Sequence, residues 1–123
     1  MDELKINLAK SRYAQAKEEL EASKVLYNSG YYKGYLSSSY YAIFHSVRTV
    51  FAFERIDSKR HTGVIHLFSQ NFVKTQLIKN ELQVMLSNAF QVRVESDYKD
   101  FYVVSRDEAQ KQLSNAELFL NEI

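Results

Sequence analysis

The stretch Tyr31–Glu54, with the sequence YYKGYLSSSYYAIFHSVRTVFAFE, decides the fold. Its side chains recur at helical spacing in two neighbouring stripes, the first made of Leu36, Tyr40, Ile43, Val47 and Val50 and the second of Tyr41, Phe44, Arg48 and Phe51. A helix with two adjacent stripes of this kind packs against neighbours on more than one side. We therefore expect residues 31–54 to form the central helix of a bundle, in which Ser37–Ser39 let a neighbouring helix come close.

The segments on both sides of this helix also have helical spacing. Before it, small or apolar residues from Ile6 to Tyr27 recur at alternating gaps of three and four, and Gly30 can adopt the left-handed conformation that ends a helix. After it, Ser105 and Glu108 form a capping box that predicts the start of the last helix. The expected helices are 2–29, 31–54, 63–73, 80 to the low 90s and 105–123, with a polar connection at 55–62.

Composition limits the fold and the kinds of site. With no proline and three glycines in 123 residues, the chain lacks the turn residues that β folds need. We predict a single all-α domain over residues 1–123, an antiparallel bundle of four to five helices. The absence of cysteine excludes disulfides, thiolate zinc sites and thiol nucleophiles.

A net charge of +1 excludes a broad polycationic surface but leaves room for a local basic groove. No apolar run approaches the roughly 20 residues of a membrane span, and we expect a cytoplasmic protein.

The stretch Ala89–Tyr98, AFQVRVESDY, is the candidate site because it combines an arginine, two carboxylates and a phenol. Arg93 follows Ala89 by one turn on a mostly apolar stripe, where an unpaired guanidinium would be costly. Arg93 and Asp97 are four residues apart, so one interpretation is a salt bridge on the helix surface. The other is that the donors of Arg93 bind a phosphate group or a partner protein. Both interpretations are open at this point.

The three histidines do not form a metal-binding pattern. His61 and His66 are five residues apart, which on a helix separates them by about 140° in azimuth. His45 is remote in sequence, and neither His-Glu-x-x-His nor Glu-x-x-His is present. We therefore expect no metal and no cofactor, and we interpret His61 as a cap or surface residue next to Arg60.

The chain is rich in aromatic residues, with nine tyrosines and eight phenylalanines. Tyrosines from Tyr27 to Tyr41, interleaved with Lys33, are suited to stacking on nucleobases. The interpretation that we favour is that they fill the bundle and hydrogen-bond at its rim. Phe51 and Phe53, near the end of the central helix, are candidates for a dimer interface.

Four groups of residues occur in an order that is similar to a known family. They are Tyr40-Tyr41-Ala42-Ile43-Phe44, then His61-Thr62-Gly63-Val64-Ile65 with Phe68, then Arg93-x4-Tyr98 preceded by Asp97, and finally Glu108-Ala109. Over nearly its whole length the chain resembles the HEPN family (higher eukaryotes and prokaryotes nucleotide-binding domain), in particular its small stand-alone prokaryotic branch. The resemblance implies a helical bundle that pairs as a homodimer. It also implies a partner, because many HEPN proteins act beside a minimal nucleotidyltransferase as toxin and antitoxin.

The resemblance also implies an activity for some members, which are metal-independent ribonucleases with the motif Arg-x4-6-His. In that motif arginine holds the scissile phosphate and histidine transfers protons. Arg93 matches the arginine, but the places of the histidine are taken by Tyr98, Lys99 and Asp100. Tyrosine, with an ordinary pKa near 10, is a poor general base at neutral pH.

Three hypotheses follow. The leading one is a dimeric nucleotide- or RNA-binding module that partners a minimal nucleotidyltransferase in a toxin–antitoxin-type pair. Its candidate binding residues are Arg93, Asp97, Tyr98, Arg48 and His61. The alternative is a divergent metal-independent endoribonuclease toxin with Arg93 and Tyr98 as catalytic residues. A tetratricopeptide-like adaptor is the third hypothesis, and the lack of a 34-residue repeat disfavours it.

Overall fold

The computed structural model describes residues 3–54, 56–98 and 106–122, with the side chains at 97–98, 106–109, 113 and 122 outside the description. Within these ranges every regular element is a helix, as the sequence predicts. The elements are α1 (Glu3–Asn28), α2 (Tyr32–Glu54), α3 (His61–Phe68), the π-helical turn η1 (Ser69–Val73), α4 (Asn80–Tyr98) and α5 (Arg106–Glu122). No helix among the described residues is both long and apolar enough to cross a membrane.

Helix α1 ends in the turn that the sequence predicts at Gly30. Gly30 has a φ of +81°, a conformation that favours glycine. The N–H of Gly30 donates to the carbonyl of Tyr27 at 3.1 Å, and the N–H of Tyr31 donates to the carbonyl of Leu26 at 2.9 Å. These two bonds form a Schellman motif, which satisfies the last carbonyls of α1 and reverses the chain into α2.

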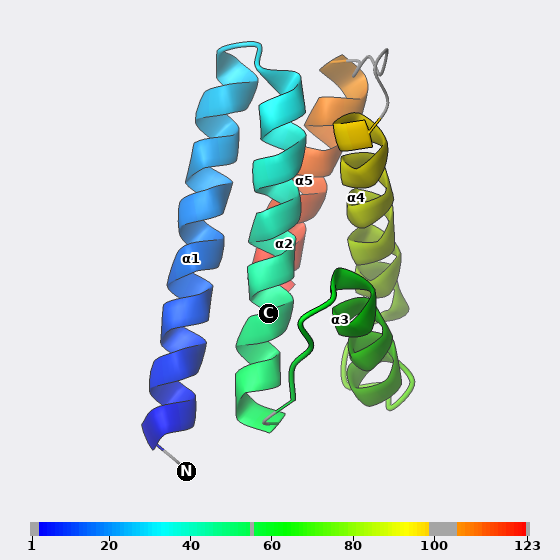
Figure 1. Cartoon of the computed structure of the whole chain (residues 1–123). Helices are drawn as coiled ribbons and strands as arrows, with labels where there is room; N and C mark the ends of the chain where they lie inside the picture. Colours follow the sequence, from blue (N-terminus) through cyan, green and yellow to red (C-terminus); the bar gives the residue numbers. More distant parts are fainter. Residues whose placement is uncertain (1–2, 55, 99–105, 123) are drawn as a thin grey trace.

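Helix α2 is the central helix, as expected. It lies between α1 and α4, with α5 behind it, and it contacts all four of the other α-helices (Figure 1). Half of its residues are buried, among them Tyr35, Tyr40 and Phe51, which have no exposed surface. The two tyrosines fill the interior, in agreement with the packing interpretation. Phe51 does the same, so its assignment to a dimer interface is wrong, whereas Phe53 is 38% exposed.

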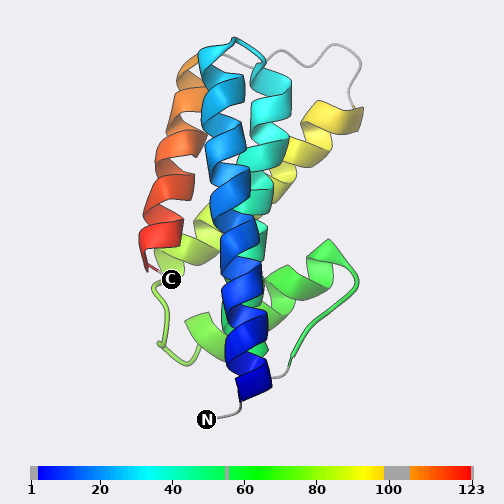
Figure 2. The same ribbon diagram turned by 90° about the vertical axis from the view of Figure 1, so that its left-hand side faces the viewer.

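Helix α1 packs along α2 through small side chains. Ala9, Ala16 and Ser23 follow one another at intervals of seven residues and are all buried. Because these side chains are short, the two helices can approach closely over much of their length. Figure 2 shows α1 lying along α2 in this way, while α3 and η1 cross the bundle at an angle near the C-terminal end of α2.

The third and fourth helices differ from the expected bounds. Helix α3 begins at His61, two residues earlier than predicted, because the N–H of Val64 already donates to the carbonyl of Arg60. The predicted segment 63–73 is not one α-helix, since it passes into η1, where the N–H of Lys74 donates to the carbonyl of Ser69 at 2.9 Å.

Helix α4 is longer than the sequence analysis predicted, since it continues through the polar residues after Arg93 to Tyr98. No proline or glycine interrupts this segment. Ser96, in the added turn, is buried, so tertiary packing supports the extension. The sequence predicts that residues 98–102 connect onwards, but Tyr98 belongs to α4, and the rest of that segment and the capping residue Ser105 lie outside the described residues. Helix α5 nevertheless begins at Arg106, where the capping box predicts its first turn.

Candidate functional site

Three helices bring an aromatic cluster together around His61. Helix α2 contributes Tyr40, Tyr41 and Phe44, α4 contributes Phe90, and His61 itself is the first residue of α3. The imidazole stacks on the ring of Phe44 with centroids 4.6 Å apart. It lies 5.7 to 6.0 Å from the rings of the other three residues. We call these five residues the His61 cluster. The N-cap of α3 is Arg60, so the interpretation of His61 as a cap is wrong, whereas its half-buried side chain packs in a tertiary contact and keeps part of its surface exposed.

A short hydrogen bond fixes one edge of this imidazole. The hydroxyl oxygen of Tyr40 lies 2.6 Å from Nδ1 of His61. Tyr40 has no exposed surface, and its burial raises the pKa of the phenol well above the ordinary value. The phenol therefore keeps its hydrogen at neutral pH. Tyr40 lies on the apolar stripe of α2, so the sequence predicts its burial but gives no sign of a polar role.

Arg93 reaches the same cluster from α4. Its guanidinium carbon lies 5.0 Å from the ring centroid of Tyr41 and 5.6 Å from that of Tyr40. Cation–π contacts of this kind contribute about 0.5–1 kcal/mol at exposed sites and more where water is excluded. Arg93 is half-buried, as its place on the inner stripe of α4 predicts. Burial and, secondly, the charge of Arg93 lower the pKa of His61, which favours the neutral imidazole at pH 7.

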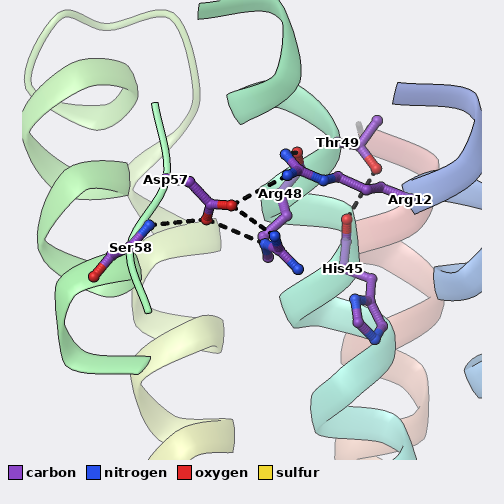
Figure 3. Close-up of polar contacts among 6 residues, drawn as sticks. All are labelled: Arg12, His45, Arg48, Thr49, Asp57 and Ser58. Carbon is purple, nitrogen blue, oxygen red and sulfur yellow. Dashed lines mark hydrogen bonds and ion pairs between the residues drawn. The ribbon is translucent and has the colours of Figure 1, made fainter. Parts of the chain in front are cut away.

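A polar network is centred on Asp57, in the connection between α2 and α3 (Figure 3). Asp57 accepts hydrogen bonds from Nε and Nη2 of Arg48 at 3.2 and 2.6 Å and from Nη2 of Arg12 at 3.1 Å. Arg12 also donates to the carbonyl of Arg48 at 2.8 Å. Burial raises the pKa of Asp57, but the bonds from Arg48 and Ser58 and the charges of both arginines outweigh it and lower the pKa overall. Asp57 therefore stays ionised and holds the connection against α1 and α2.

A surface pocket of about 590 Å³ joins the network to the cluster. It is lined by Phe44, Arg48, Asp57, Ser58, Lys59 and His61. Two cationic side chains and one carboxylate give it a net positive charge, which suits an anionic ligand. We call it the His61 pocket. Neither Asp57 nor Lys59 is prominent in the sequence, since both belong to a polar connection whose place in the fold depends on tertiary contacts.

The structure unites only part of the predicted site. Arg93 and His61 approach the same two tyrosine rings, and Arg48 lines the pocket that His61 also lines. Asp97 and Tyr98 belong to the last turn of α4, but their side chains, and hence the proposed Arg93–Asp97 pair, lie outside the described residues. Among the described residues no three histidine or carboxylate side chains group closely enough to hold a metal ion.

Comparison with known proteins decides the family. The sequence matches the model of the HEPN domain over residues 9–123. The chain belongs to the HEPN family. Three relatives align with most of this HEPN chain. A protein of Methanocaldococcus jannaschii named "Putative toxin MJ0142" is 34% identical over 87% of the chain and 73% of its own length.

Another protein of that organism, "Putative toxin MJ0605", is 30% identical over 88% of the HEPN chain and 80% of its own length. A protein of Archaeoglobus fulgidus described as a UPF0332 protein is 34% identical over 98% of the HEPN chain and 91% of its own length. The family match agrees with the resemblance inferred from the motifs around Tyr40, His61 and Arg93, and with the all-helical bundle. It also displaces the hypothesis of a tetratricopeptide-like adaptor.

Proposed function

We propose that this HEPN chain is the nucleotide- or RNA-binding component of a toxin–antitoxin-type pair. It works as a homodimer beside a minimal nucleotidyltransferase and recognises phosphate groups. The observation that carries this proposal is the convergence of Arg93 and His61 on the rings of Tyr40 and Tyr41, beside a pocket with net positive charge. The names of two relatives, both called toxins, support the toxin–antitoxin context.

The chemistry of the site supports phosphate recognition. The guanidinium of Arg93 offers a planar fork of donors that suits phosphate oxygens, and the aromatic rings beneath it hold its plane. Arg48 and Lys59 add positive charge at the neighbouring pocket. Asp97 and Tyr98, one turn further along α4, remain part of the proposed binding surface for nucleotide, RNA or the partner protein.

The second candidate is an endoribonuclease, favoured by the place of His61 beside Arg93. Positions 98–100 hold no histidine, but α3 delivers one to the same cluster from elsewhere in the chain. In such a reaction the 2′-oxygen bonds to the adjacent phosphorus while its proton passes to a base. The bond to the 5′-oxygen breaks, leaving a 2′,3′-cyclic phosphate and a 5′-hydroxyl that takes up a proton. Arg93 would stabilise the charge on the phosphate.

Growth assays separate the two functions. A host expresses the chain or its Arg93→Ala variant, each with and without the gene that lies next to the gene of this chain. Arg60→Ala, at an exposed arginine, is the matched control and is expressed in the same two ways. Toxicity that is lost only in Arg93→Ala, with cleaved RNA in the cells, indicates the ribonuclease. Growth without RNA cleavage, together with co-purification of the adjacent protein, indicates the binding module. If the purified chain binds neither RNA, nucleotide nor that protein, the binding proposal is wrong.

A further inference from the structure

The bond between Tyr40 and His61 has a direction that follows from burial. Tyr40 makes no other hydrogen bond to the described part of the chain through its hydroxyl, and its side chain has no exposed surface. A buried hydroxyl hydrogen without an acceptor is costly, so it points to the nitrogen 2.6 Å away. Tyr40 therefore donates and Nδ1 of His61 accepts.

This direction sets the tautomer of His61. A neutral imidazole carries one hydrogen, and a nitrogen that accepts a hydrogen bond cannot carry it. The hydrogen of His61 is consequently on Nε2. No described residue hydrogen-bonds to Nε2, and His61 is one of the residues that line the His61 pocket. The ring therefore offers the pocket a donor and no basic lone pair.

We infer that Tyr40 is a positioning residue that holds His61 in its Nε2–H form, and that the His61 pocket accepts a phosphate group through this N–H. The choice of phosphate rests on the proposed function, whereas the tautomer rests on the geometry alone. Lys59, Arg48 and Asp57 line the same pocket, and because Asp57 is paired with Arg48, Lys59 supplies the net positive charge. A donor at Nε2 binds a phosphate oxygen but cannot remove a proton from a 2′-hydroxyl, so the same geometry favours binding over base catalysis by His61.

Nitrogen NMR tests the tautomer. Long-range N–H correlation spectra of the ¹⁵N-histidine-labelled chain at pH 7.5, with His61 assigned through His61→Gln, distinguish a bare nitrogen from a protonated one. We expect bare Nδ1 and protonated Nε2 in the wild type, and a mixture of both tautomers in Tyr40→Phe, which keeps the ring. Tyr13→Phe removes another phenolic donor, to the carbonyl of Leu120, and should leave the His61 signals unchanged. Protonated Nδ1 in the wild type, or an unchanged tautomer in Tyr40→Phe, would overturn the inference.

Titration with three probes tests the ligand. Inorganic phosphate, adenosine 5′-monophosphate and a short single-stranded RNA are each added while the Nε2 signal of His61 is followed. We expect each probe that binds to shift the Nε2 signal of the wild type in a saturable way. The affinity for the probe should fall about three- to tenfold in Tyr40→Phe and in Lys59→Ala. Lys74→Ala removes an exposed lysine outside the pocket and should leave the affinity unchanged. A shift with phosphate that RNA does not strengthen assigns the pocket to small phosphates. If the tautomer is as inferred and no probe shifts the signal, the phosphate assignment is wrong and the positioning role of Tyr40 stands.

Discussion

Arg48 and Asp57 form a two-point ion pair that ties the α2–α3 connection to the central helix. Two nitrogens of one guanidinium reach the two oxygens of one carboxylate, at 3.2 and 2.6 Å. Arg12 from α1 donates to the same carboxylate, so two cations share one anion (Figure 3). The connection then leads directly to His61. The pair is therefore both a wall of the His61 pocket and part of what places the imidazole.

Removing the charge of Asp57 should weaken this junction. Asp57→Asn leaves Arg12 and Arg48 close together without an anion between them, and we expect a loss of about 1 kcal/mol in the free energy of unfolding, since the carboxylate is partly exposed. Denaturant titration measures the loss. Glu21→Gln breaks the more exposed pair with Lys24 and is the matched control, with an expected change in the free energy of unfolding within about 0.5 kcal/mol. Equal effects of both substitutions would show that the network adds nothing beyond a surface ion pair.

Acidification should destabilise the protein through two histidines. Burial and then the charges of nearby arginines lower the pKa of both His45 and His61. In addition, Nδ1 of His45 is buried without a hydrogen-bond partner among the described residues. A group whose pKa is lower in the folded than in the unfolded state is protonated at a higher pH in the unfolded chain, so acid favours unfolding. The free energy of unfolding is thus constant well above pH 6.5 and falls as the pH drops below it.

The slope of stability against pH between 7.5 and 5 measures this effect. Each such histidine contributes at most about 1.4 kcal/mol per pH unit. His45→Gln should flatten the slope, and His66→Gln, at an exposed histidine of α3, controls for the loss of an imidazole. A slope that His45→Gln leaves unchanged would exclude His45 as a source of the pH dependence.

The sequence predicts what depends on neighbours along the chain. The turn at Gly30, the two stripes of α2 and the half-buried position of Arg93 all follow from local periodicity and glycine conformation. The role of His61 does not, because it requires α3 to bring its first residue against α2 and α4. Likewise, the bonds of Asp57 to Arg12 and Arg48 span 45 and nine residues. Nothing in the polar connection marks Asp57 as their acceptor.

Gly63, in the segment that resembles the family, has a steric role. A Cβ atom there would lie 2.1 Å from Oγ of Ser58 and 2.9 Å from its Cβ. We expect Gly63→Ala to displace the connection before His61 and to lower the free energy of unfolding by about 1–3 kcal/mol, the usual effect of overpacking. Adding Ser58→Gly removes both clashing atoms and should recover much of that loss in thermal unfolding. If Ser58→Gly does not restore the stability of Gly63→Ala, the clash with Ser58 is not the cause of the loss.

Gln112 of α5 should couple to Ser39 of α2. Its Nε2 donates to Oγ of Ser39 at 2.6 Å and to the carbonyl of Leu36 at 3.1 Å, and both side chains are buried. Gln112→Leu should lower the free energy of unfolding by about 1–2 kcal/mol. Ser39→Ala should lower it less in the Gln112→Leu background than in the wild type, because the bond between the two side chains is already lost there. We expect a coupling energy of about 1 kcal/mol from a double-mutant cycle by urea unfolding. The exposed Gln15→Leu controls for the change of residue type and should shift stability by less than about 0.5 kcal/mol. Additive losses for the pair would mean that α5 is held on α2 by apolar packing alone.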